Sequence, residues 1–291
     1  MREAVNLAHR AVVGTAKVAL SLGPFGASLS PAQEFDGCYP PPFGPQKYRK
    51  GAREVNLYKV EDQDLELASI EALADFHLKR LRVFADDEEI WTKIDIVSFE
   101  TVPLVREVVA IRLAMHRLYS PKPIPPAQKP WWISTVWPNG QSPQKSSEGN
   151  QAVTTPSDVF RAVFSQKMYP SANSENNLAS PSAVGINCTA LADVVTIAGQ
   201  FTEALRMCED PGLPEKPWLV MYPNGGDVYD IETQKWIATE SNSKESWAQQ
   251  MNNLIGSITG KNPNLWGGII VGGCCRTGAK DIESLRGLID A

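Results

Sequence analysis

Short apolar runs alternate with longer segments of helical periodicity along most of the chain. In the longer segments, apolar residues recur three or four positions apart, which indicates amphipathic helices. Helices are predicted at residues 1–16, 61–84, 105–118, 191–207, 246–258 and 279–289. The short runs are nearly continuous, as in strands covered on both faces. Strands are predicted at residues 18–22, 94–99, 131–136, 183–188, 218–222 and 267–272.

This alternation predicts an α/β protein whose parallel strands are joined by crossover helices. Such units fit an open doubly wound sheet or part of a (β/α)8 barrel. No Gly-x-Gly-x-x-Gly segment follows a predicted strand, which disfavours a dinucleotide-binding sheet. We predict a single domain over residues 1–291. Two segments rich in Ser, Asn, Gln and Pro, at residues 138–155 and 169–181, are predicted to be surface insertions.

Charge and hydropathy exclude several classes of function. The net charge is -5 and no basic stripe is present, so nucleic-acid binding is disfavoured. No apolar run approaches the roughly 20 residues of a membrane-spanning helix. The N-terminus lacks the apolar stretch of a secretory signal. We therefore expect a cytoplasmic protein without a membrane partner.

The most informative residues are cysteines at the ends of two predicted strands. Cys188 ends one strand, and Cys274 and Cys275 follow another in a Gly-Gly-Cys-Cys segment. Ligands of α/β folds bind at the carboxyl ends of parallel strands, so the three thiols could converge there. Three thiolates with an open fourth position are a catalytic zinc arrangement. The simpler alternative is that all three are small buried core residues.

The remaining cysteines and the histidines lack this context. Cys38 is assigned no role, and Cys208, which lies in a predicted helix, is assigned to packing. The histidines, His9, His77 and His116, fall in predicted helices away from strand ends and are assigned no role.

Several segments resemble the zinc-dependent homocysteine S-methyltransferases. Residues 184–188 (Val-Gly-Ile-Asn-Cys) and 272–277 (Gly-Gly-Cys-Cys-Arg-Thr) look like the two zinc-ligand motifs of that family. Residues 222–226 (Tyr-Pro-Asn-Gly-Gly) resemble its Tyr-Pro-Asn-Ser-Gly segment, with Gly225 in place of serine. Further similar blocks are residues 21–27, 34–39 and 95–107.

The resemblance implies a reaction and a set of site residues. Cys188, Cys274 and Cys275 would hold Zn²⁺, and the sulfur of homocysteine would take the fourth position. The bound thiolate would attack the methyl group of S-methylmethionine or S-adenosylmethionine, giving methionine. Additional substrate-binding residues are implied: Glu100 for the ammonium group of homocysteine, and Asn187 and Asn224 to orient the site. Three aromatic residues near predicted strand ends are candidates for cation–π contact with the sulfonium donor: Phe25, Trp137 and Tyr222.

One feature of the family is missing from the sequence. The family's barrel opens with a strand carrying an Asp-Gly-Gly type motif, a helix and a second strand, and none of these is found here. The resemblance therefore predicts an incomplete (β/α)8 TIM barrel that holds strands three to eight.

Two other functions stay open. The chain could be a non-catalytic zinc-binding relative or a fragment of such an enzyme. It could also be a different (β/α) enzyme whose cysteines act as a redox pair or nucleophile, although adjacent Cys274 and Cys275 lack the usual Cys-x-x-Cys spacing. The sequence does not show which methyl donor is used, or whether the acceptor is homocysteine or selenocysteine. It does not predict an oligomeric state.

Overall fold

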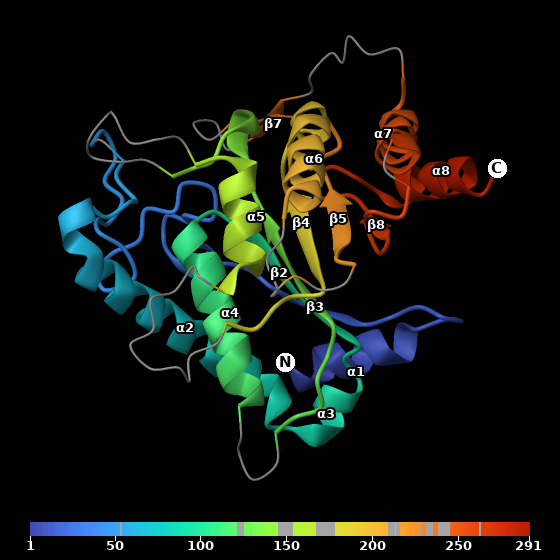
Figure 1. Cartoon of the computed structure of the whole chain (residues 1–291). Helices are drawn as coiled ribbons and strands as arrows, with labels where there is room; N and C mark the ends of the chain where they lie inside the picture. Colours follow the sequence, from blue (N-terminus) through green and yellow to red (C-terminus); the bar gives the residue numbers. More distant parts are fainter. Residues whose placement is uncertain are drawn as a thin grey trace.

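The computed structural model joins six strands of the described chain in one parallel sheet (Figure 1). They are β1 (Ala19–Leu22), β2 (Ile96–Val102), β3 (Trp131–Thr135), β4 (Ala183–Asn187), β5 (Trp218–Tyr222) and β8 (Ile269–Val271). A short antiparallel pair comprises β6 (Val228–Asp230) and β7 (Lys235–Ile237). The structure describes residues 1–52, 54–120, 125–144, 154–166, 178–208, 213, 216–226, 228–230, 235–237, 245–261 and 263–291.

The order of the strands distinguishes the two predicted architectures. Spatial order follows chain order, β1-β2-β3-β4-β5-β8, and every neighbouring pair is parallel. A doubly wound sheet would reverse direction at a switch point. This sheet does not reverse and ends at β1 and β8 within the described chain. The prediction of an α/β sheet from an incomplete barrel is therefore confirmed.

Helices surround the sheet, and α1 and α3 lie below it in the view of Figure 1. They are α1 (Arg2–Ala11), α2 (Gln63–Ala85), α3 (Glu88–Thr92), α4 (Val105–Tyr119), α5 (Pro156–Phe164), α6 (Leu191–Arg206), α7 (Trp247–Lys261) and α8 (Ala279–Ile289). Short 3-10 turns are η1 (Phe25–Ser28), η2 (Val60–Asp62) and η3 (Pro138–Gly140). From α4 to α8 each helix contacts the next, and α2 packs on α4. In the described chain no helix has the length and apolar character needed to cross a bilayer.

The helix-facing side of the sheet forms the main core. Phe99 pairs with Ile133, Ile133 with Val184, and Val184 with Leu219. All four side chains are fully buried and belong to one cluster with helix residues such as Phe201. Burying each such side chain stabilises the fold by about 1.5–3 kcal/mol. A slip of one residue would turn them to the other face, so packing fixes the register.

The opposite side of the sheet is more polar than its sequence pattern predicted. Ser98 and Ser134 are buried there. Ser134 pairs with Gly185, where a Cβ would lie 2.3 Å from Oγ of Ser134. Glycine thus lets the serine side chain lie directly against β4. The face of the sheet that points away from the helices therefore carries buried polar groups.

Two helices were not predicted from the sequence. Helix α5 begins at a capping box: the side chain of Thr155 accepts a hydrogen bond from Asp158 N–H, and the side chain of Asp158 accepts one from Thr155 N–H. Helix α3 spans only five residues, too few for a periodic pattern. It lies just before β2 and contacts α1.

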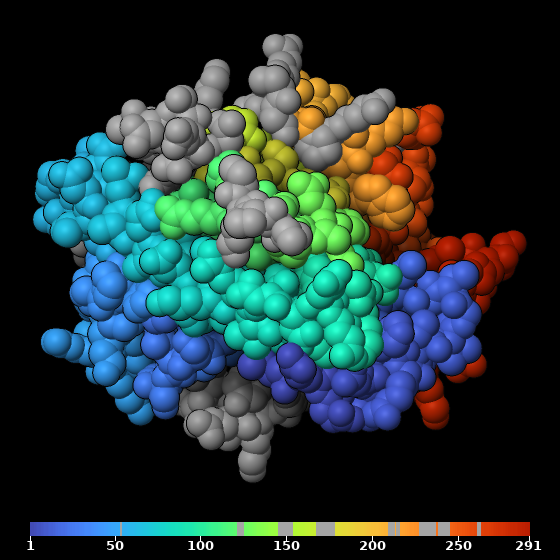
Figure 2. All heavy atoms as spheres, turned by 90° about the horizontal axis from the view of Figure 1, so that it is seen from below, coloured from blue at the N-terminus to red at the C-terminus, as the bar shows by residue number. Residues whose placement is uncertain are grey.

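Figure 2 shows the molecule from below. This face is covered largely by the first third of the chain, blue to teal.

The sequence-based boundaries hold less well in the first helix and in the insertions, whereas α8 has the bounds predicted for it. Helix α1 ends at Ala11, earlier than predicted, because Val12 is extended. The first proposed insertion, residues 138–155, holds η3 and the N-cap of α5 in its described part. Of the second, residues 169–181, only 178–181 are among the described residues.

A buried carboxylate ties the loop after β1 to the helix layer. Glu107 of α4 accepts hydrogen bonds from Phe25 N–H and Tyr39 O–H, each at 2.6 Å. His77 Nε2 of α2 lies 3.0 Å from the same carboxylate. Burial raises the pKa of Glu107, but these hydrogen bonds and His77 outweigh it and leave the pKa lowered. His77, which was assigned no role from the sequence, thus belongs to a structural polar cluster.

Candidate metal centre

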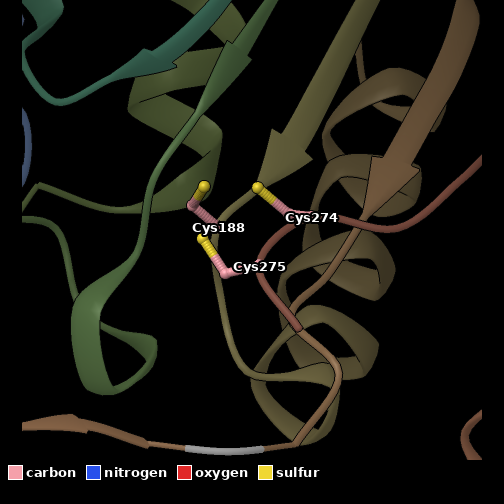
Figure 3. A group of neighbouring side chains, drawn as sticks. All are labelled: Cys188, Cys274 and Cys275. Carbon is pink, nitrogen blue, oxygen red and sulfur yellow. The ribbon is translucent and has the colours of Figure 1, made fainter. Parts of the chain in front are cut away.

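The structure brings together the sulfurs of the three cysteines that the sequence singled out. Cys188 follows β4, whereas Cys274 and Cys275 follow β8, on the far side of β5. Their Sγ atoms all lie within 4.8 Å of one another. Figure 3 shows the three side chains pointing toward a common point from two loops. Among the described residues, this is the group of His, Cys, Asp and Glu side chains that could hold a metal ion.

The segment after β5 holds the two cysteine loops together. Asn224 N–H donates to Thr189 O at 3.0 Å, beside Cys188. Gly225 N–H donates to Cys275 O at 2.8 Å, and Cys274 N–H donates to Pro223 O at 2.8 Å. The segment from Pro223 to Gly225 therefore bridges both loops through its backbone.

Gly225 is required by close packing in this bridge. A Cβ at this position would lie 2.4 Å from the backbone oxygen of Arg276. Arg276 itself has a positive φ of 65°. The glycine that replaces the serine of the resembled segment therefore matches the tight contact with the Cys275 loop.

The backbone reverses sharply at Cys188. Its φ of 49° lies in the left-handed region, which is uncommon for a residue other than glycine. Directly after it, Thr189 Oγ1 donates to Asn187 O at 2.9 Å and closes the turn. This turn directs the Cys188 side chain toward the other two cysteines (Figure 3).

The thiols influence one another strongly. The hydrogen bond between Cys188 and Cys274 raises the pKa of Cys188, and burial raises it further. The same hydrogen bond lowers the pKa of Cys274. One thiol of the cluster is therefore easier to ionise than an isolated cysteine, and another is harder to ionise. A cluster that concentrates thiolate character in this way suits a cation that thiolates prefer.

The cluster fits zinc in both chemistry and spacing. A tetrahedral zinc with Zn–S bonds of about 2.3 Å needs sulfurs about 3.8 Å apart. The spacing of the three Sγ atoms, each pair within 4.8 Å, accommodates this with small side-chain rotations. Cys188, Cys274 and Cys275 are each half-buried, so the cluster is not sealed inside the core.

The other predicted site residues lie at the ends of neighbouring strands. Glu100, at the end of β2, is half-buried and accepts a hydrogen bond from Ser98 Oγ at 2.8 Å. Asn187, at the end of β4, is buried. Oδ1 of Asn224 is buried and has no hydrogen-bond partner among the described residues.

Tyr222 connects the carboxylate side of the site with the thiols. Burial raises the pKa of the Tyr222 hydroxyl, and the charges of Glu100 and Cys274 raise it further. The hydroxyl must therefore lie within electrostatic range of both groups. Its buried oxygen lies beside the side chains of Ser134 and Trp132, which act against this rise in pKa.

The other two aromatic candidates are engaged in the core. Phe25 stacks on Phe43 with ring centroids 4.0 Å apart. Trp137 is buried, packs on Phe201, and donates through Nε1 to Thr135 Oγ1 at 2.9 Å. Of the three, Tyr222 is the one on which the charges of Glu100 and Cys274 act. Cys38 and Cys208 lie apart from the metal-binding group.

Sequence reasoning missed Thr101. This residue contacts both Asn187 and Cys188. The available signal was its place beside Glu100 in the segment of residues 95–107. Its partners, however, are far away in the sequence: Asn187 lies 86 positions and Cys188 lies 87 positions from Thr101. Only the folded chain brings them together.

An α/β sheet with strands in chain order and three thiols at its carboxyl edge defines a part-barrel protein with a candidate thiolate metal site. The sequence model of the homocysteine S-methyltransferase family matches residues 1–289, and the chain belongs to this family.

Named relatives agree with this assignment. Selenocysteine Se-methyltransferase from Brassica oleracea var. italica is 24% identical over 269 residues, which cover 92% of this chain and 56% of the relative. Homocysteine S-methyltransferase 1 from Arabidopsis thaliana is 25% identical over 273 residues, covering 93% of this chain and 60% of the relative. This chain thus spans little more than half the length of these curated relatives.

A solved structure supports the fold. The metallated form of the homocysteine methyltransferase MmuM from Escherichia coli matches with a TM-score of 0.52 and 22% sequence identity. The match covers 98% of this chain and 65% of that chain. At this identity the likeness establishes the architecture, and site roles rest on the residues of this chain.

Proposed function

We propose that this chain catalyses zinc-dependent methyl transfer from a sulfonium donor to homocysteine, giving methionine. The observation that carries the proposal is the convergence of Cys188, Cys274 and Cys275 at the carboxyl edge of the sheet. Membership of the homocysteine S-methyltransferase family supports the acceptor and the reaction.

The three cysteines would hold the metal through their Sγ atoms. Zinc bound there would act as a Lewis acid that lowers the pKa of the homocysteine thiol, near 8.5 for a free thiol, so that its proton leaves to solvent. Cys188 contributes one ligand from the β4 loop, and the Pro223–Gly225 bridge keeps Cys274 and Cys275 in reach of it. Such a preformed cluster lowers the cost of ordering the ligands on metal binding.

In the transfer itself, the homocysteine sulfur attacks the methyl carbon of the donor in line. A new bond forms between this sulfur and the methyl carbon while the methyl–sulfonium bond breaks. The electron pair of the broken bond stays on the donor sulfur, which becomes a neutral thioether. S-methylmethionine and S-adenosylmethionine are the proposed donors. Because anion and cation neutralise each other, the protein's main task is positioning in a site with little water.

Glu100 is the proposed partner of the homocysteine ammonium group. Its carboxylate is half-buried, and the hydrogen bond from Ser98 fixes its orientation. The charges of Glu100 and Cys274 both act on the Tyr222 hydroxyl, and Tyr222 is the proposed aromatic contact of the donor. Asn187 and Asn224 are proposed to orient the site, and the unpartnered Oδ1 of Asn224 is available to a ligand.

Further expectations accompany this function. We propose that residues 1–291 form one domain with surface insertions at 138–155 and 169–181. We place the protein in the cytoplasm, where a reducing environment keeps the metal-binding thiols free of disulfides. Selenocysteine is the alternative acceptor, as the name of the Brassica relative suggests.

The test is zinc content per chain of the folded, size-fractionated protein, followed by an assay for methionine formation. We expect about one zinc per chain. Cys275→Ala should lose the metal. Cys208→Ala, which removes a thiol outside the cluster, should keep it.

Each outcome separates the candidate functions. Zinc uptake with methyl transfer from either donor supports the proposal. Zinc uptake with no methyl transfer from either donor would establish the non-catalytic zinc-binding alternative. Transfer that survives complete chelation of zinc would favour a metal-independent cysteine enzyme.

A further inference from the structure

The end of β2 is distorted at Thr101. The register between β2 and β3 shifts between Phe99 and Val102. Within this shift Thr101 has a φ of 60°, in the left-handed region. A β-branched residue rarely adopts this conformation, and outliers of this kind cluster at functional sites where the surroundings enforce them.

Asn187 provides the contacts that enforce it. Thr101 N–H donates to Asn187 Oδ1 at 2.8 Å, and Asn187 Nδ2 donates to Thr101 Oγ1 at 2.7 Å. Strands β2 and β4 are not neighbours, because β3 lies between them. The Thr101–Asn187 pair therefore reaches across the end of β3 and locks two strand ends together.

The remaining hydrogen of the threonine hydroxyl has a defined direction. Since Asn187 donates to Oγ1, the hydroxyl is free to donate elsewhere. Sγ of Cys188 lies 3.9 Å from Oγ1 and accepts this hydrogen bond. Cys188 is also in the left-handed region, with a φ of 49°. One side chain thus supports both distorted strand ends.

We infer that Thr101 is a positioning residue of the metal centre. Its hydroxyl fixes the Cys188 sulfur for metal binding, and its backbone holds the adjacent Glu100 at the distortion. The inference rests on the proposed role of Cys188 as a zinc ligand and assigns a role to a residue outside the ligand set. Hydrogen bonds that orient metal ligands commonly change affinity by about 10- to 100-fold.

The first test compares Thr101→Val, which keeps the branched shape but loses the hydroxyl, with Thr101→Ser, which keeps the hydroxyl. Zinc affinity is measured by competition with a chromophoric chelator, and the cobalt-loaded protein gives the thiolate-to-metal absorption band. We expect a roughly 10- to 100-fold weaker affinity and a shifted band for Thr101→Val. Thr101→Ser should stay within about threefold of the unaltered chain, given one retained hydrogen bond.

A second variant separates ligand positioning from fold stability. Thr101→Gly removes the hydroxyl and also relieves the left-handed strain. We expect its thermal midpoint to equal or exceed that of the unaltered chain, while its zinc affinity falls as in Thr101→Val. Thr202→Val is the matched control: it removes a buried hydroxyl in α6, bonded to Ala198 O at 2.7 Å, and should leave zinc affinity unchanged.

The outcomes distinguish this inference from the proposed function. If the folded, unaltered chain takes up no zinc, the proposed function fails and the inference fails with it. If the unaltered chain binds zinc and both Thr101→Val and Thr101→Gly bind it equally well, only the inference is overturned. Loss of affinity in proportion to stability across all four variants, Thr202→Val included, would likewise show Thr101 to be merely structural.

Discussion

Glu100 joins the distorted end of β2 to the proposed substrate. Replacing it with glutamine keeps the shape and the hydrogen bond from Ser98 but removes the charge that would meet an ammonium group. Hydrogen bonds to charged groups contribute about 1.5–3 kcal/mol. We therefore expect Glu100→Gln to raise the KM for homocysteine roughly 10- to 100-fold. Steady-state kinetics with varied homocysteine measure this change.

The control for Glu100→Gln is Glu89→Gln on the surface of α3. Glu89 is 74% exposed and pairs with Lys93, and such exposed pairs contribute little. The control should leave the KM for homocysteine unchanged. An unchanged KM in Glu100→Gln, with zinc content equal to that of the parent, would remove Glu100 from the substrate site.

Replacing Gly225 with serine tests how tightly the two cysteine loops are packed. A serine here would place its Cβ 2.4 Å from Arg276 O, so the backbone of the Cys275 loop must move. We expect Gly225→Ser to lower the free energy of unfolding by about 1–3 kcal/mol and to weaken zinc binding. Urea unfolding and chelator competition measure the two effects. Gly199→Ala in α6, where a Cβ meets nothing within 4 Å, should not weaken zinc binding.

Some residues of the site could be predicted from local sequence patterns, and others could not. The three cysteines were predictable because each follows an apolar run, and parallel strands place such positions at one edge. Their hydrogen-bonded neighbours were not. Thr101 and Asn187 are 86 residues apart, and His77 meets Glu107 across 30 residues. No local pattern marks pairs that only the packing of distant elements creates.

At the scale of elements, the loop after β1 depends on the buried carboxylate of α4. Three donors from different segments converge on Glu107: Phe25 N–H, Tyr39 O–H and His77 Nε2. Glutamine would direct its NH₂ group at one of them and leave buried polar groups unsatisfied. We expect Glu107→Gln to lower the free energy of unfolding by about 2–3 kcal/mol. Urea denaturation at neutral pH measures this loss.

The same carboxylate predicts a pH dependence. Its pKa is lowered in the folded protein relative to the ordinary value of 4.5, so the unfolded chain binds the proton more readily. The stability from Glu107 is therefore present above pH 4.5 and is lost as the pH falls through the lower folded pKa. Glu107→Gln should lose less stability on acidification below pH 4.5 than the parent. A slope as steep in Glu107→Gln as in exposed Glu89→Gln would contradict this.

Helix α5 shows why some elements escaped sequence prediction. Its nine residues lie between two polar segments, and the apolar pattern is too short to stand out from them. Its start is nevertheless encoded by Thr155, Pro156 and Asp158, the residues of a capping box with proline in the first turn. Long helices such as α2 and α4 were predictable because their periodicity is sustained.

For the molecule as a whole, strand order carries the most architectural information. The alternation of strands and helices indicated a parallel sheet but left the barrel and the doubly wound sheet open. The resemblance pointed to the barrel, and the order without reversal confirms it. The sheet of the described chain ends at β1 and β8, and β8 has only three residues, each half-buried. Strand β8 is therefore held less firmly than β2 or β4.

Because β8 is weakly attached, a metal ion bound at the site would help to hold it to the rest of the sheet. Zinc bound to Cys188, Cys274 and Cys275 would join the β8 loop to the β4 loop across β5. Binding stabilises the states that form the site, by about 2.7 kcal/mol at a zinc concentration 100 times the Kd. We expect zinc to slow hydrogen exchange up to roughly 100-fold at amides whose opening breaks the site.

Two amides report on the link directly: Cys274 N–H, bonded to Pro223 O, and Gly225 N–H, bonded to Cys275 O. Both should gain protection with zinc, and so should Phe99 in the centre of β2, because global unfolding also breaks the site. Ser120 N–H at the end of α4, bonded to His116 O, should gain little, because local fraying there leaves the site intact. Cys275→Ala should abolish the gain. Without zinc, Cys274 and Gly225 should exchange faster than Phe99 if β8 opens separately from the core. Equal rates at these three amides without zinc would mean that β8 is as firmly held as the core. The exchange rates without and with zinc thus decide whether the metal only equips the site for chemistry or also holds β8 in place.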